Sequence, residues 1–166
     1  MKKILAIATA SLAILGTNSY ADSLKKDITI LANINDAIYV SKPDGSTWYD
    51  TEELYATDYK QKKFVSDDLK VRVWSTSEQF DVSLSQPLTI SRTDGTELKN
   101  VAVKFADQPV KLENKTTIKQ TTSSDTGYEN TYTLKISAEA PEITTEGSSL
   151  NGSYKGDLVM LFEPKL

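Results

Sequence analysis

The sequence predicts an all-β fold in which two sheets pack face to face as a sandwich. Two observations carry this prediction. Apolar and polar residues alternate with a period of two over much of the chain beyond residue 27, which is typical of strands with one face in a core and one in water. Turn-forming residues separate these runs at short intervals, and Thr, Ser and Val are frequent within them, as in sandwiches built of many short strands.

Five runs carry the alternation and are expected to form strands. They span residues 28–34, 69–74, 80–84, 101–105 and 132–136. A sixth run, Tyr154–Phe162, is apolar at consecutive positions from Leu158 onward. Such a strand is either buried on both faces or paired with a segment from outside the chain.

Turn chemistry places the connections between these strands. Pro43–Ser46 and Thr93–Thr96 each contain Asp-Gly, and the second is expected to close a hairpin. Asn151, followed by glycine, is expected to open the final strand. Helical periodicity is scarce, and a short helical turn is expected only at Asp50–Tyr59.

Residues 1–21 are expected to form a cleaved signal peptide. Lys2 and Lys3 precede an apolar stretch, Ile4–Leu15, which at 12 residues is too short to cross a bilayer as a helix. Ser19–Ala21 then fits the small-x-small pattern of a cleavage site. We therefore expect an exported protein whose mature chain begins after this site.

Composition narrows the function classes. Cleavage leaves 166 − 21 = 145 residues, enough for one domain, in which 19 − 2 = 17 basic residues face 23 acidic ones, a net charge of −6. This balance argues against a nucleic acid partner, since phosphate binding needs a basic surface. The chain has no histidine and no cysteine, which excludes Ser-His and Cys-His nucleophilic pairs, disulfides and the usual zinc sites. We expect no catalytic residues, no metal site and no cofactor.

Three stretches of the mature chain together resemble one family. Lys26–Ile34 is similar to the Lys-x-Ile-Thr-Val-x-Ala-x-Val start of mature major pilins of the alternate chaperone–usher class, which build enteric colonization-factor fimbriae and cable pili. Val71–Val73 followed by Phe80–Leu88 is similar to a strand pair of these pilins that ends in a Pro-x-Leu-like turn. Ser153–Phe162 is similar to their closing strand, with Tyr-x-Gly before alternating aliphatics.

The resemblance implies an incomplete immunoglobulin-like β-sandwich, residues 36–166, that lacks one strand and is completed by an N-terminal strand donated from a neighbouring copy. Residues 22–35 would be the donor strand. Its inward side chains would be those of Ile28, Ile30, Ala32 and Ile34. The acceptor groove, which a chaperone would also use, would be lined by Tyr154, Leu158, Met160 and Phe162.

The resemblance also implies partners and a cellular location. Copies of the chain would polymerise head to tail into a fibre for adhesion to host cells. A periplasmic chaperone would fill the groove first, an outer-membrane usher would replace it with the next subunit, and a minor tip adhesin would end the fibre. The chain would pass through the periplasm to a fimbrium on the cell surface.

The residues alone leave two other functions open. The pattern by itself favours an N-terminal strand within its own sheet, as in a self-complete secreted sandwich. Such a domain would bind a glycan through the aromatic side chains of Trp48, Tyr49, Tyr55 and Tyr59, although packing over a sandwich edge is the favoured interpretation of these residues. The second alternative, a periplasmic enzyme or inhibitor, is disfavoured by the missing histidine and cysteine.

Overall fold

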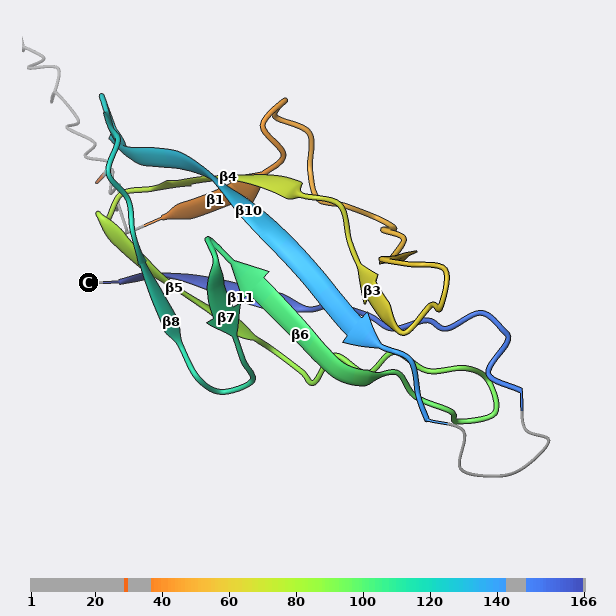
Figure 1. Cartoon of the computed structure of the whole chain (residues 1–166). Coiled ribbons are helices and arrows are strands. Elements are labelled where there is room, and N and C mark those ends of the chain that lie inside the picture. The colour runs from red at the N-terminus through yellow and green to blue at the C-terminus, as the bar shows by residue number, and fades with distance from the viewer. Residues whose placement is uncertain (1–28, 30–36, 143–148, 166) are drawn as a thin grey trace, which may run out of the picture. The chain divides into compact units, whose positions relative to one another are not determined.

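The structure, a computed structural model, describes residues 29, 37–142 and 149–165. The chain divides into two units, residues 1–33 and 34–166, and the fold described below is that of the second unit. All regular secondary structure among its described residues is β-strand (Figure 1). This confirms the prediction of an all-β fold.

The larger sheet is organised around β10 (Gly127–Glu139), which is long enough to pair with several strands. It pairs with β4 (Leu69–Ser75) through its first half, and with β6 (Lys99–Phe105) and β3 (Lys63–Val65) through its second half, always antiparallel. Beyond β4 the sheet is extended by β1 (Ile38–Ser41). Three short strands pair with β3, β6 and β10 respectively: β2 (Tyr55–Ala56), β7 (Gln108–Val110) and β9 (Ser123–Ser124).

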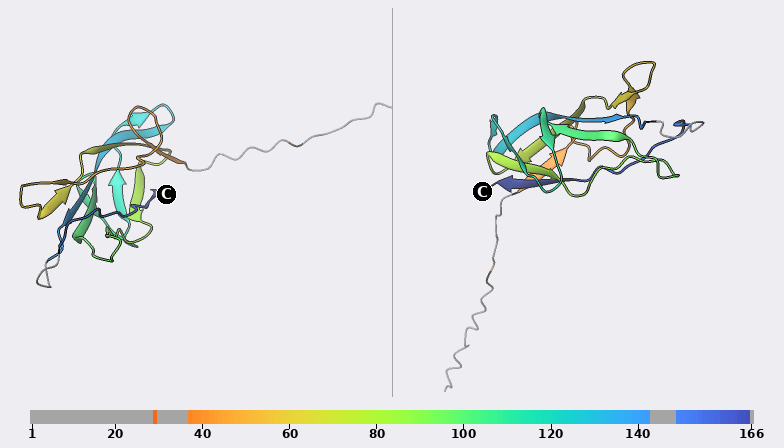
Figure 2. Two further views of the ribbon diagram at one scale, coloured as in Figure 1. Left: turned by 90° about the vertical axis from the view of Figure 1, so that its right-hand side faces the viewer. Right: turned by 60° about the horizontal axis from the view of Figure 1, so that its bottom comes forward.

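The smaller sheet has the antiparallel order β11–β5–β8. It consists of β11 (Met160–Lys165), β5 (Gln79–Leu84) and β8 (Thr116–Lys119). The two sheets face each other across a shared core (Figures 1 and 2). The chain passes from one sheet to the other just after β7, where the amide of Leu84 donates to the carbonyl of Lys111 at 3.0 Å. This crossing joins the sheets along one side.

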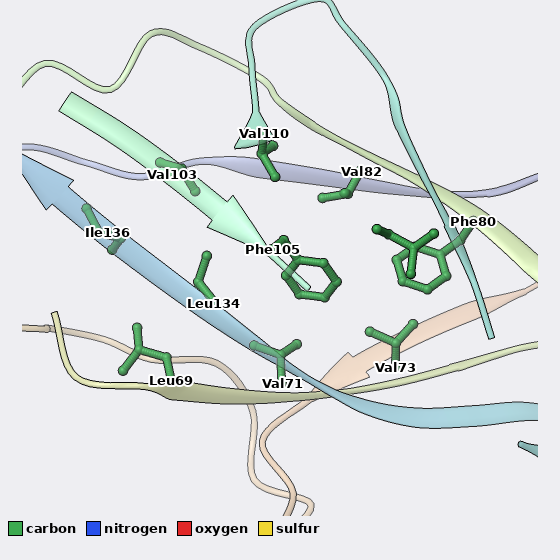
Figure 3. Packing of buried hydrophobic residues seen from close by; sticks show 11 residues of the cluster. Leu69, Val71, Val73, Phe80, Val82, Val103, Phe105, Val110, Leu134 and Ile136 are labelled. Carbon is green, nitrogen blue, oxygen red and sulfur yellow. The ribbon is translucent and has the colours of Figure 1, made fainter. Parts of the chain in front are cut away.

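The core is formed by the inward side chains of both sheets (Figure 3). Burial alternates along β4, where Leu69, Val71 and Val73 are at most 6% exposed. Phe80 and Phe105 come from opposite sheets, are fully buried, and meet edge to face with their ring centroids 6.2 Å apart. Each such buried side chain stabilises the fold by about 1.5–3 kcal/mol. The alternation seen in the sequence therefore holds the two sheets together.

Four of the predicted strands coincide with β4, β5, β6 and β10, and both Asp-Gly turns are present. Gly45 and Gly95 have φ angles of 84° and 86°, a left-handed conformation that costs glycine little and other residues more. The second turn closes a hairpin as predicted, with the amide of Leu98 donating to the carbonyl of Ile90 at 2.8 Å.

The predicted helical turn at Asp50–Tyr59 is wrong. The regular structure in this segment is β2, in which Tyr55 pairs with Val65 and Ala56 with Phe64. Strand pairing across the fold thus outweighs a weak local helical preference, as is common for short segments.

The predicted start of the final strand is also wrong. The ladder between β11 and β5 begins at Met160, not at Asn151. Between these positions Lys155 exchanges backbone hydrogen bonds of 2.9 Å with Ser91, so the chain first pairs with the hairpin loop and only later with β5.

The buried hydroxyl of Tyr132 provides a pH-dependent test of this core. It has no hydrogen-bond partner among the described residues, and burial raises the pKa of Tyr132 to about 12 from a usual 10.0. Between these pH values the unfolded chain loses this proton and the folded chain keeps it, so the free energy of unfolding should fall as the pH rises. Tyr132→Phe should flatten this fall and leave stability at pH 7 unchanged or higher, because it removes an unpaired buried hydroxyl.

Denaturant unfolding of a chain of residues 22–166 from pH 7 to 11.5 measures both effects. The control is Tyr59→Phe, because the Tyr59 side chain is 88% exposed. Equal pH dependence in the two variants would contradict the burial of the Tyr132 hydroxyl.

Candidate functional site

Both sheets end in an edge strand on the same side of the sandwich. In the part of the chain that the structure describes, β1 is the last strand of the larger sheet and β11 is the last strand of the smaller one. The two strands are neighbours but form no ladder with each other (Figure 2). On this side, therefore, the sandwich is not closed by backbone pairing between the described strands.

An apolar groove of about 360 Å³ lies between these edge strands. The ring of Phe162 packs against the core ring of Phe105 at 5.5 Å and against the indole of Trp48 at 6.1 Å, which connects the groove to the core. Five residues from β1, the loop that follows it and the C-terminal segment line the groove: Val40, Trp48, Val159, Met160 and Phe162.

The side chains of β11 divide between two faces. Phe162 lies opposite the fully buried Val82 of β5, so Phe162 and Met160 face inward. Leu161 lies on the other face and is 45% exposed. The run that is apolar at consecutive positions in the sequence therefore supplies a groove lining on one face and an exposed side chain on the other.

The backbone of β11 also presents hydrogen-bonding groups to the groove. The amide of Ser85 donates to the carbonyl of Val159 at 2.9 Å, so the backbone groups of Val159 point toward β5. Because these directions alternate along an antiparallel strand, the N–H and C=O groups of Met160 and Phe162 point the other way, toward the open edge. Pro164 shares this direction but has no N–H to offer.

The edge of β1 has the same arrangement. The amide of Thr76 donates to the carbonyl of Ala37 at 3.0 Å, which fixes the backbone direction at the start of β1. The N–H and C=O groups of Ile38 and Val40 therefore point toward the open edge. An extended segment laid between β1 and β11 could bond to both edges while its alternate side chains entered the groove.

Comparison with protein families matches residues 24–163 to the CS1 type fimbrial major subunit. The match covers most of the chain. The chain belongs to this family. A comparison with curated proteins gave no match.

Membership of the CS1 type fimbrial major subunit family confirms the resemblance to major pilins of the chaperone–usher type. The family consists of structural subunits, which also confirms the prediction that the chain is not an enzyme. No group of three or more His, Cys, Asp or Glu side chains among the described residues could hold a metal ion. No helix in the same residues is long and apolar enough to cross a membrane.

The side chains predicted to form the acceptor site of this fimbrial subunit fall into three places. Met160 and Phe162 line the groove. Leu158 is half-buried against the core, and Tyr154 lies in a separate polar network. The predicted donor side chains, and with them the donor strand at residues 22–35, lie outside the described residues except for the exposed Thr29. The acceptor and donor roles stay predictions.

Three groove residues are not among the predicted acceptor side chains: Val40, Trp48 and Val159, the last of which lies within the predicted final strand. Val40 belongs to an alternation of only three residues, Ile38 to Val40, just before a turn, which is too short to stand out. Trp48 was assigned to an aromatic cluster in an irregular region, where no periodicity indicates which way a side chain points.

The aromatic residues of the glycan hypothesis divide between the groove and the surface. Trp48 packs against Phe162 as well as against Tyr49. Tyr55 is 50% exposed on β2, and Tyr59 is 88% exposed in the following loop. Trp48 therefore lines the groove and is separated from the exposed Tyr55 and Tyr59.

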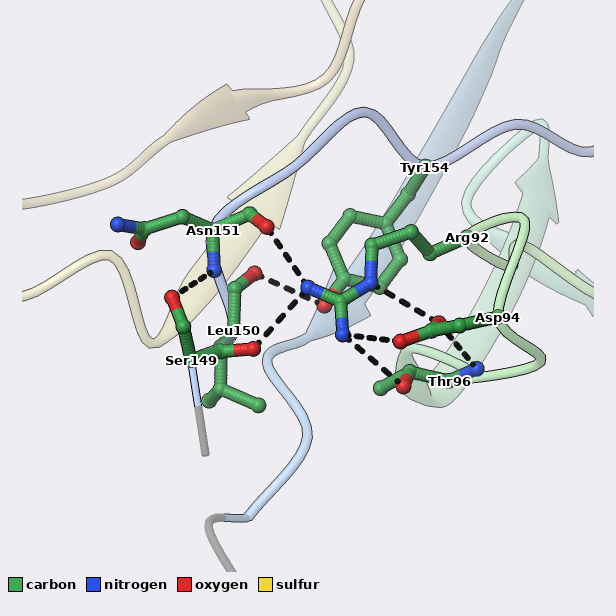
Figure 4. A network of polar contacts seen from close by, with 7 residues as sticks. All are labelled: Arg92, Asp94, Thr96, Ser149, Leu150, Asn151 and Tyr154. Carbon is green, nitrogen blue, oxygen red and sulfur yellow. Dashed lines mark hydrogen bonds and ion pairs between the residues drawn. The ribbon is translucent and has the colours of Figure 1, made fainter. Parts of the chain in front are cut away.

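A polar network fixes the segment that leads into β11 (Figure 4). Arg92 donates from Nη1 to the carbonyls of Ser149 and Asn151 at 3.0 and 2.7 Å. Its Nε donates to the carboxylate of Asp94 at 2.9 Å, and the ring centroid of Tyr154 lies 5.9 Å from the guanidinium. The hydrogen bond from Arg92 holds the pKa of the Asp94 carboxyl well below its usual range, so this pair stays ionised in neutral solution.

Backbone contacts continue this attachment toward β11. Ser91 and Lys155 exchange two hydrogen bonds of 2.9 Å. At the next residue, a Cβ on Gly156 would lie 2.2 Å from the carbonyl oxygen of Thr89, so glycine is required for the two backbones to approach this closely. The chain thus reaches β11 from a fixed position.

Arg92→Ala should loosen this attachment without unfolding the core. Loss of the guanidinium leaves the carbonyls of Ser149 and Asn151 without this donor, while the Asp94 carboxylate keeps its hydrogen bond from the Thr96 amide. We expect the exchange rates of the Ser91 and Lys155 amides to rise several-fold, measured by hydrogen exchange. Lys119→Ala, which removes an exposed ion pair with Glu78, is the control and should leave these rates unchanged. Unchanged rates in Arg92→Ala would show that the backbone contacts alone hold the segment.

Proposed function

We propose that this fimbrial subunit polymerises by donor-strand exchange, in which residues 22–35 of one copy fill the groove between β1 and β11 of the next. The observation that carries the proposal is the pair of edge strands, whose backbone groups point into an apolar groove from both sides. A strand added there would satisfy both edges and bury the groove lining.

The predicted donor strand suits this apolar groove in its pattern of side chains. Its alternate residues include three isoleucines and one alanine. Burial of the three isoleucines would contribute roughly 4.5–9 kcal/mol, at about 1.5–3 kcal/mol each, before backbone hydrogen bonds are counted. Without cysteine, no disulfide adds to this hold between subunits.

The exchange would give an open fibre. The strand of each copy leaves its own domain and enters the next, so the interface is head-to-tail and does not close into a ring. A periplasmic chaperone would occupy the groove of the newly exported subunit, and an outer-membrane usher would exchange it for the next donor strand. A minor tip adhesin would end the fibre. The function of the fibre at the cell surface would be adhesion to host cells.

Ile30→Asp tests the donation. It would place an unpaired carboxylate in the apolar groove of the neighbouring copy, which costs several kcal/mol, so fibre yield should fall at least ~10-fold. Any remaining fibres should dissociate at a lower temperature. Fibre yield and thermal dissociation of the full-length chain are the measurements.

Asn33→Asp is the matched control for this variant. It changes the charge by the same amount three residues away, on the face of the strand that would point out of the groove. We expect it to assemble nearly as well as the unmodified chain. Equal loss in both variants would indicate a general charge effect, and no loss in Ile30→Asp would exclude this donor strand.

A further inference from the structure

The outer face of β11 carries an exposed apolar side chain that the groove does not use. Leu161 is 45% exposed there. The next residues on this face are Glu163, whose carboxylate bonds to Lys115 at 2.8 Å, and Lys165, which donates to Thr117 at 2.9 Å. A strand added at the open edge of β11 would lie directly beside this apolar, acidic and basic series.

The predicted donor strand has an outer face of the same kind. If its isoleucines enter the groove, the intervening residues face out, because side chains alternate along a strand. This outward set is polar except for one leucine. It consists of Asp27, Thr29, Leu31 and Asn33.

Resting on the donor-strand exchange proposed above, we propose that the donor strand runs antiparallel to β11 in the register that places Leu31 of one copy beside Leu161 of the next. The same register places Asp27 beside Lys165. Two apolar side chains, Leu31 and Leu161, then lie beside each other, and the acidic Asp27 lies beside a basic lysine. Each kind of cross-strand pair stabilises a sheet. The outer face of β11 is thereby a second recognition surface, which selects one register among those that the groove could accept.

Other arrangements lose these matches. A shift by two residues in one direction places Leu31 beside Glu163, and a shift in the other direction places Asp27 beside the same carboxylate. A parallel strand with Leu31 beside Leu161 places Asp27 beside Asp157. Like charges directly opposite each other destabilise a sheet, and a shift by one residue would turn the isoleucines out of the groove.

The inner face agrees with this register. Ala32, the smallest inward side chain of the donor, comes to lie beside the long Met160. Ile28 comes to lie beside Pro164, which has no N–H for the ladder. This pair would therefore have one ladder hydrogen bond instead of two, accepted by the carbonyl of Pro164.

Paired cysteine variants measure the register directly, because the chain has no cysteine of its own. The full-length chain carrying Leu31→Cys and Leu161→Cys is assembled into fibres, oxidised and dissolved in denaturant without reductant. The two positions form a non-hydrogen-bonded pair in this register, with Cα atoms about 4.5 Å apart, inside the disulfide range of about 4.4–6.8 Å. We expect a ladder of covalent multimers on a denaturing gel. Thr29→Cys with Glu163→Cys should give a second such ladder.

Two further pairs separate the failure of the register from the failure of donation. Leu31→Cys with Glu163→Cys, and Thr29→Cys with Val159→Cys, report a shifted and a parallel strand and should stay monomeric. A ladder from either of them overturns the register but leaves donation intact. A fifth pair, Thr29→Cys with Leu161→Cys, reports the opposite shift, and a ladder from it also overturns the register alone. Fibres that give no covalent multimers from any of the five pairs, or monomers with an internal disulfide, overturn donation itself. If Leu31→Cys prevents assembly, the Thr29 pairs still decide the register.

Discussion

Backbone N–H and C=O groups at the outer edges of β1 and β11 have no ladder partner among the described strands. A strand edge that is left without partners attracts another strand, and most folds protect such edges. Among the strands that the structure describes, the larger sheet ends at β1 and the smaller at β11, and an apolar groove separates them. Opposite this side the chain crosses between the sheets after β7 and joins them. Within the described residues, backbone contacts therefore join the two sheets along one side and leave the other side open.

Contacts on both sides of the groove fix the position of the open edge of β11. β11 is held by its ladder to β5, and the segment before it is held by Arg92 and by the close contact at Gly156. On the other side, Trp48 packs against Phe162 and connects the loop after β1 to the groove. These contacts would hold the groove in one position before a strand is added, which would lower the entropic cost of the proposed strand addition.

The strands and turns could be predicted from the sequence because they depend on local patterns. Alternation with a period of two identified β4, β5, β6 and β10, and Asp-Gly identified the turns. The groove depends instead on contacts between distant segments, such as Trp48 with Phe162 and Arg92 with Asn151, which leave no periodic signal. The start of β11 at Met160 was missed for the same reason, since pairing with the hairpin loop delays the ladder.

Hydrogen exchange at the edges of β1 and β11 tests directly whether a strand from a neighbouring copy fills the groove. It is measured in full-length subunits kept monomeric and in assembled fibres. The amides of Leu161 and Glu163 face β5 and should be protected in both states. Donor-strand exchange predicts fast exchange in the monomer and strong protection in the fibre at the edge amides of Ile38, Val40, Met160 and Phe162. Protection of these four amides in both states would show that the chain fills its own groove. Fast exchange in both states would show that no strand enters the groove.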